Sequence, residues 1–338
     1  MKNSSSYWTK RQALNYTAGE KEVVEYYKDL RKVFNQVKEE IEDVIKDFYI
    51  RYADNNGVSY SMAQKLLDKR EIKDLDNFIK HVYATLGTRD TEVINKSIKA
   101  RITRYEALQM QIEAILDNLY DNHFKTKGEE KLKDIYKGSY ERTWYNIDSY
   151  NGFHKEFAQI PIRDIETLIK YPFNGANFSD RLWKQKEHMI TKLKENITTM
   201  LVQGKNPKTL SKDFAKIFNT KENEAYRLLH TESSFIIEQG TLQAYKEDGV
   251  EEYQILATLD TKTSEICQEK DSKVYSVSEY VTGKTAPPFH PFCRTTTVPY
   301  YGDDEGTRVA RNPLSNKSME VPSAMSYKEW QKTYVLNK

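Results

Sequence analysis

Apolar residues in the first half of the chain recur in alternating steps of four and three. This spacing begins at residue 23 and is typical of a long helix with one buried stripe that packs against other helices. The stripe consists of Val23, Tyr27, Leu30, Phe34, Val37, Ile41, Val44 and Phe48. Residues 55–57 (NNG) end the pattern. Residues 1–20 are polar apart from the adjacent pair Tyr7 and Trp8.

Further amphipathic helices are predicted as far as residue 248. Two are expected over residues 61–86 and 94–119, and an aromatic helix is expected after a charged break at 125–130. Residues 171–179 form a turn by composition, and Ser179 or Asp180 is expected to cap the helix that follows. That helix is expected to end at residues 204–207. Two shorter helices, over 210–218 and 223–246, are expected to lead to Gly249.

The pattern changes after residue 249. A short strand is predicted over 252–258 and a second over 295–298, with a long proline-rich loop between them. We therefore predict a mainly α protein with a small C-terminal α+β module of two strands. The expected ranges are an N-terminal helical region (1–170), a central helical region (171–248), the module (249–301) and a polar tail (302–338).

Composition excludes several classes of protein. The chain has 338 residues, of which 52 are basic and 50 acidic, so its net charge of +2 creates no overall field for nucleic-acid binding. Two cysteines do not make a disulfide framework. The first ten residues do not resemble a signal peptide, and no apolar run approaches the length of a membrane helix. We expect a soluble protein without a membrane segment, made in a cytoplasm.

One group of residues has the character of a metal site. Cys267, His290 and Cys293 lie in or beside the proline-rich loop, and thiolate and imidazole are good zinc ligands. A fourth ligand is missing. Asp260, Asp271 and His230 are the candidates, and spacing does not choose among them. In the alternative interpretation both cysteines are small buried residues and His290 bonds to the backbone of its turn.

The same residues permit an enzyme interpretation. Cys267 or Cys293 would be the nucleophile of a hydrolase, His290 its base, and Asp260 the group that orients the imidazole. No local signature around either cysteine supports this, and no glycine-rich phosphate loop occurs in the chain.

Lysines are frequent between residues 184 and 212, with few acidic residues among them. Such lysines could contact DNA phosphates without sequence preference, although a solvated helix surface explains them equally well. The set is Lys184, Lys186, Lys192, Lys194, Lys205, Lys208 and Lys212.

The chain resembles the Mu F-like minor head proteins of tailed bacteriophages, also called phage head morphogenesis proteins. The resemblance is most specific in the block that runs from Asp260 to Arg294. The sequences that carry it are 260–263 (DTKT), Cys267, 287–294 (PPFHPFCR), the helices around 204–214 and 225–232, 7–11 (YWTKR) and 174–183 (NGANFSDRLW). Ser264 and Thr295 stand where many relatives have cysteine, and His230 stands where arginine is usual. The loss of two sulfur ligands weakens the zinc interpretation.

The resemblance implies a structural protein without catalytic residues, present in few copies per particle. Such proteins associate with the portal during head assembly in the host cytoplasm and are packaged inside the capsid. Some members are thought to contact the genome or accompany its delivery, and related blocks occur fused to toxin domains. Our leading hypothesis is therefore a minor capsid protein of the virion. Its expected partners are the portal, capsid or scaffold proteins, and double-stranded DNA; a Cys/His hydrolase of head maturation is the alternative.

Overall fold

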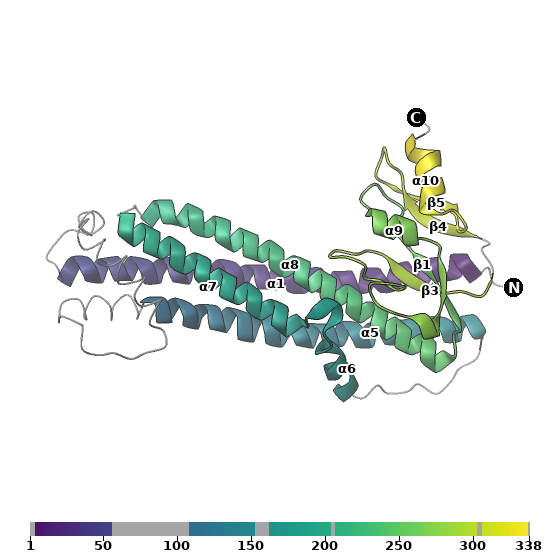
Figure 1. Ribbon diagram of the computed structural model, residues 1–338, viewed down its shortest axis with the longest axis horizontal. Helices are drawn as coiled ribbons and strands as arrows, with labels where there is room; N and C mark the ends of the chain where they lie inside the picture. Colours follow the sequence, from purple (N-terminus) through teal and green to yellow (C-terminus); the bar gives the residue numbers. More distant parts are fainter. Residues whose placement is uncertain (1–3, 56–107, 153–161, 204–206, 303–305, 337–338) are drawn as a thin grey trace. The chain divides into compact units, whose positions relative to one another are not determined.

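The computed structural model describes residues 4–55, 108–152, 162–203, 207–302 and 306–336, and most of them are helical (Figure 1). The long helices are α1 (Ser4–Asn55), α5 (Lys127–Asn151), α7 (Phe178–Gln203) and α8 (Pro207–Asp248). Shorter helical elements are η1 (Asn118–Thr126), α6 (Ile162–Ile169) and η2 (Phe173–Gly175). The mainly α fold with a small C-terminal α+β module is confirmed. None of the described helices is both long enough and apolar enough to cross a membrane.

The chain forms two compact units. Unit 1 combines Met1–Lys28, Lys127–Arg181 and Ala225–Lys338, and unit 2 combines Asp29–Thr126 and Leu182–Glu224. The boundaries between the units fall inside α1, α7 and α8. The division into four consecutive regions stays a prediction.

The core of unit 2 comes from the apolar stripes of its helices. In α1 the buried positions are Leu30, Phe34, Val37, Ile41 and Ile45. The stripe follows the predicted spacing from Leu30 to Ile41, but Tyr26 is buried in place of Tyr27 and Ile45 in place of Val44, since 3.6 residues per turn do not keep step with a strict heptad. Aromatic edge contacts from Phe34 to Tyr120 and Phe218 close this core.

Several helix boundaries differ from the sequence prediction. Helix α1 begins at Ser4 instead of Val23, because Trp8, Gln12 and Asn15 are buried on its first turns. Residues 108–151 are helical throughout, so the expected break at 125–130 is wrong; the π-helical stretch η1 joins α5 there directly.

Helix α8 is also longer than predicted. It is one helix of 42 residues instead of two short ones, because the polar stretch near residue 220 contains no Gly or Pro. The cap of α7 is Asn177, whose side chain accepts from Asp180 N while Asp180 accepts from Asn177 N. The helix expected over 61–86 and most of the one over 94–119 lie outside the described residues.

Beyond α8, three strands form an antiparallel sheet in the order β2-β1-β3. Both predicted strands are present, as β1 (Glu252–Leu256) and β3 (Thr296–Pro299), and β2 (Val274–Ser276) adds a third. Helix α9 (Glu265–Lys270) and the 3₁₀ turn η3 (Val277–Glu279) lie in the connections. In Figure 1, β1 and β3 lie beside the C-terminal part of α8 within unit 1.

Residues 306–336 are folded, whereas a polar tail was expected after residue 301. Strands β4 (Thr307–Arg311) and β5 (Ser318–Pro322) pair antiparallel, followed by α10 (Tyr327–Gln331) and η4 (Lys332–Leu336). Trp330 is fully buried against Leu259 and Ala310. A few apolar residues are enough to stabilise this segment, because it packs on the module that precedes it.

Helices α5 and α8 pack closely in unit 1 because of Gly240. A Cβ atom at this position would lie 2.9 Å from Tyr136 O and 3.1 Å from Tyr140 N, and both of these are backbone atoms that cannot move aside. Beside this contact, the Ser139 hydroxyl donates to Ile237 O over 2.8 Å. The close approach lets the buried polar groups of the two helices pair.

We predict that Gly240→Ala destabilises the protein by about 1–3 kcal/mol, since it overpacks a backbone contact. The matched control is Gly138→Ala on α5, where the added Cβ meets only the movable end of the Arg142 side chain. That variant should be neutral or stabilising by up to about 1 kcal/mol, the usual gain from alanine in a helix. Urea unfolding measures both. Equal free energies of unfolding for the two variants would contradict the close approach.

Candidate functional site

The three predicted ligands meet in the module of unit 1. Cys267 is on α9, and His290 and Cys293 are in the proline-rich turn before β3. Phe292 has a φ of 60°, and Cys293 N donates to His290 O over 3.2 Å, so the turn brings both ligands to the same side. Both cysteines are buried and His290 is partly exposed. One ligand atom from each residue lies within 4.8 Å of the others.

The spacing of these atoms fits a tetrahedral zinc ion. The two sulfur atoms are 3.7 Å apart, and Cys267 Sγ is 3.1 Å from His290 Nε2. Around zinc, with its usual bond lengths, two sulfur atoms lie about 3.8 Å apart, and a sulfur and a nitrogen about 3.5 Å apart. Only a small outward movement of the imidazole is needed. The residues present therefore fit a metal that takes two sulfurs and one nitrogen.

Hydrogen bonds prepare the three residues for metal binding. The Cys267 thiol donates to the Cys293 sulfur, which lowers the pKa of Cys293 to about 7 and raises that of Cys267. Backbone N–H groups of Phe289 and Thr295 also lower the pKa of Cys293. His290 Nδ1 lies 2.7 Å from Pro291 O. A proton on Nδ1 satisfies that carbonyl and leaves Nε2 as the free ligand atom.

Ser264 and Thr295 lie around this cluster. Ser264 Oγ is 2.7 Å from His290 Nε2. The hydroxyls of Ser264 and Thr295 both form hydrogen bonds with the Cys267 sulfur, and Thr295 also bonds to Cys293. Hydroxyls thus occupy the places where relatives offer sulfur. The chain supplies three strong ligands and leaves a fourth position beside Ser264.

The three candidates for the fourth ligand have other partners. Asp260 accepts from Arg294 at both oxygens, over 2.5 and 2.8 Å. Asp271 accepts from Arg308 at both oxygens over 3.0 Å. His230 Nε2 faces Glu20 Oε1 over 3.3 Å. None of them belongs to the ligand cluster among the described residues.

The same contacts bear on the hydrolase interpretation. Cys267 and His290 meet, but Asp260 is bound to Arg294 and does not orient the imidazole. The other nitrogen of His290 faces a backbone carbonyl, as the backbone interpretation of this residue expected. The raised pKa of Cys267 disfavours a thiolate at that residue, whereas the pKa of Cys293, the other candidate nucleophile, is lowered to about 7.

Residues 230–232 of α8 contact two turns of unit 1. One is the proline-rich turn that contains His290 and Cys293, called the ligand turn below, and the other spans residues 173–181. Thr231 Oγ1 accepts from Phe292 N over 3.4 Å, and the His230 ring lies 5.1 Å from the Phe292 ring. Glu232 pairs with Arg181, whose guanidinium covers the Phe173 ring at 4.8 Å. Residues 230–232 therefore position two turns of unit 1.

Sequence reasoning missed the buried carboxylate that attaches the sheet to α8. Glu238 is fully buried and accepts from Thr296 Oγ1 over 2.5 Å and from Thr297 Oγ1 over 2.9 Å, both on β3. Burial raises the pKa of Glu238 to about 7, although these hydroxyl donors lower it. The run of threonines at the end of the loop was visible in the sequence, but it did not identify Glu238 as their partner.

The predicted DNA-contact lysines that the structure describes differ in burial and in ion pairing. Lys186 is buried and pairs with Asp117 and Asp121, over 2.8 and 3.4 Å. Lys194 pairs with Glu113, and Lys192 pairs with Glu195 over 2.8 Å. Lys184 and Lys212 are exposed. Lys205 and the side chain of Lys208 lie outside the described residues.

Comparison with known proteins agrees with the resemblance inferred from the sequence. Residues 191–298 match a family model described as Phage Mu protein F like protein. The matched segment contains α8, most of the sheet and the ligand turn, so this part of the chain is similar to the Mu F-like proteins of phage head morphogenesis. No solved structure matches the chain significantly.

A curated relative has an enzyme name. The chain is 25% identical over 288 residues to "NAD(+)--arginine ADP-ribosyltransferase EFV" of Enterococcus faecalis (strain ATCC 700802 / V583). The match covers 78% of this chain and 58% of that protein. The chain thus spans little more than half the length of this relative.

We predict that the stability of the protein falls as pH rises through 7, because of Glu238. A carboxyl whose folded pKa is about 7, against 4.5 ordinarily, favours the folded state below about pH 4.5. This advantage disappears as pH passes through 7, at a cost of up to about 3 kcal/mol. Buried Glu232, whose pKa is also raised to about 7, adds to the same trend.

Urea unfolding at pH 5 and pH 8 tests this. Glu238→Gln should lose less free energy of unfolding between the two pH values than the unsubstituted protein. The control, Glu251→Gln, removes an exposed carboxylate next to the sheet and should leave the pH dependence unchanged. An unchanged pH dependence in Glu238→Gln would refute the role assigned to this group.

Proposed function

We propose that this chain is a minor capsid protein that associates with the portal during head assembly and is packaged in the head, near the portal. The proposal rests on one observation. The Mu F-like match, residues 191–298, overlaps α8 and the folded module of unit 1. Assembly would take place in the host cytoplasm. Contact with packaged DNA would be non-specific and would use exposed lysines such as Lys184 and Lys212.

We propose a structural role without catalysis. The absence of a complete Cys/His/Asp arrangement at the candidate site supports this, as does the raised pKa of Cys267. The transferase name of the Enterococcus faecalis relative belongs to a longer protein, much of which lies outside the match. A Cys/His hydrolase of head maturation stays the alternative, because Cys267 and His290 do meet.

Co-expression with the portal of the same phage tests the role. We expect this chain to co-purify with an affinity-tagged portal after high-salt washing, and not with a tagged portal of an unrelated phage. Absence from the portal fraction would contradict portal association. Release of nicotinamide from NAD by the purified chain would contradict the non-catalytic role. Loss of a maturation cleavage in Cys293→Ala heads would favour the hydrolase.

Zinc is the metal proposed for Cys267, His290 and Cys293. It would join α9 to the ligand turn, and so stabilise a small module with few apolar residues. The fourth position, beside Ser264, would be filled by water or by the hydroxyl. Zinc would here be structural.

Elemental analysis of protein purified without chelators should give about one zinc per chain, lost in Cys293→Ser. Ser264→Cys should tighten zinc binding about tenfold or more, since a thiolate would then complete the tetrahedron. The control, Ser278→Cys, adds a thiol on η3 outside the ligand cluster and should not change zinc affinity. If the purified protein contains no zinc and does not bind added zinc, the zinc proposal is wrong and the module folds without metal.

A further inference from the structure

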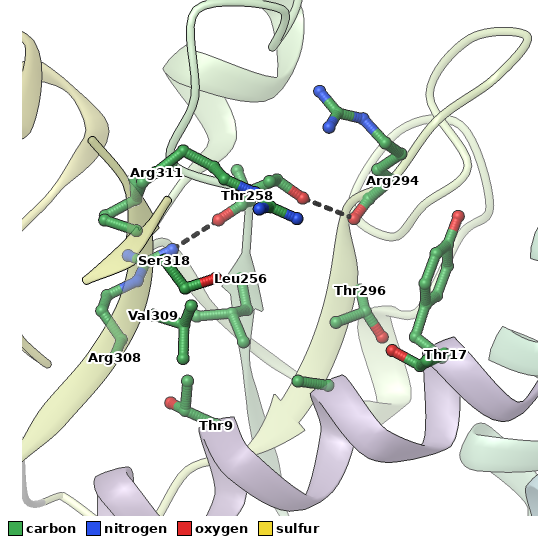
Figure 2. Close-up of a pocket in the computed structure, with 15 residues that line it drawn as sticks. Thr9, Thr17, Leu256, Thr258, Arg294, Thr296, Arg308, Val309, Arg311 and Ser318 are labelled. Carbon is green, nitrogen blue, oxygen red and sulfur yellow. Dashed lines mark hydrogen bonds between the residues drawn. The ribbon is translucent and has the colours of Figure 1, made fainter. Parts of the chain in front are cut away.

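A pocket of about 250 Å³ lies in unit 1 between the start of α1, the end of β1 and the β4–β5 hairpin (Figure 2). A water molecule occupies about 30 Å³ of liquid, so the pocket has room for about eight. That space suits a small polar ligand. Three arginines line the pocket, Arg294, Arg308 and Arg311, together with several hydroxyl groups and no acidic residue.

Arg308 supplies a buried donor that has no acceptor. It is 2% exposed, and its terminal nitrogens donate to Asp271 and to the carbonyl of Ala257. Its Nε–H finds no hydrogen-bond partner within the described part of the chain. A buried donor without an acceptor costs free energy, and a negative charge in the neighbouring pocket would offset part of this cost without touching the nitrogen itself. The two aspartate-bound arginines, Arg294 and Arg308, are fixed in place by their ion pairs.

Arg311 supplies the positive charge of the pocket that no described carboxylate balances. It lies on β4 and is exposed, and its Nη1 donates to Asn316 O over 3.2 Å. Within the described residues it forms no ion pair, whereas Arg294 and Arg308 each have an aspartate. Three guanidinium groups and two carboxylates leave one positive charge at the pocket. Figure 2 shows the Arg311 side chain extending across Thr258 over this space.

Hydroxyl groups complete the lining. Thr9 and Thr17 come from α1, and Ser318 comes from β5, so two segments far apart in the chain surround the same space in Figure 2. Hydroxyl donors and one uncompensated guanidinium are the groups that bind tetrahedral oxyanions. Apolar residues such as Leu256 and Val309 also line the pocket.

We propose that this pocket binds a phosphate group, held by Arg311 at the mouth and by hydroxyl and guanidinium donors in the wall. The phosphate could be free inorganic phosphate or part of a DNA backbone. The DNA source rests on the proposed role in the phage head, whereas binding of the free anion rests on the pocket alone.

Isothermal titration with inorganic phosphate, at constant ionic strength set by chloride, tests the proposal. Phosphate should bind the full chain, and Arg311→Gln should weaken it by about tenfold or more, since the charged contact is lost. The control is Arg227→Gln, which removes an exposed arginine of α8 outside the pocket and should bind as the unsubstituted protein does. No heat of binding, or equal affinity in Arg311→Gln, would overturn the proposal.

A second arm separates the two sources. If a short duplex DNA binds the chain and loses affinity in Arg311→Gln but not in Arg227→Gln, the pocket takes a DNA phosphate. If inorganic phosphate alone shows this dependence, the ligand is the free anion, and the phosphate site stands without the DNA contact. Portal co-purification of Arg311→Gln, measured separately, reports on the proposed head role independently of the pocket.

Discussion

The carboxylate of Glu238 is buried on α8 and accepts hydrogen bonds from two neighbouring threonines of β3. Because β3 begins three residues after Cys293, this attachment also determines where the ligand turn lies. Two further bonds reach the turn itself, since Tyr16 Oη and Ser234 Oγ both donate to Cys293 O, over 2.8 and 3.2 Å. The candidate metal centre therefore depends on helices α1 and α8 as much as on its own loop.

A second buried carboxylate organises the C-terminal end of unit 1. Asp271 receives both terminal nitrogens of Arg308 and the backbone N–H groups of Ala257 and Tyr327, each of the latter over 2.8 Å. Four donors offset the desolvation of a fully buried aspartate. Asp271 thus joins the end of β1 to β4 and α10, and it lies outside the cluster of Cys267, His290 and Cys293.

The sequence was sufficient for features that depend on local chemistry. The step of the apolar stripe predicted a mainly helical body, although several helix boundaries were wrong, and Gly249, with a φ of 75°, ends α8 where expected. The three ligands were also recognisable, because Cys and His are scarce in this chain.

Features that depend on distant partners could not be predicted from the sequence. The pairing of Asp260 with Arg294, the fold of residues 306–336 and the attachment at Glu238 all require contacts between segments far apart in the chain. The polar composition after residue 301 was misleading, because its few apolar residues form one cluster around Trp330 together with Leu259 of the preceding module.

Quantitative mass spectrometry of purified phage heads tests the central claim, a head protein that depends on the portal, most directly. Heads assembled with and without the portal would be compared, with the major capsid protein as the internal standard. The account predicts that this chain is present at a few copies in heads that contain the portal and is lost from heads that lack it. Equal abundance in both kinds of head, or absence from both, would contradict it.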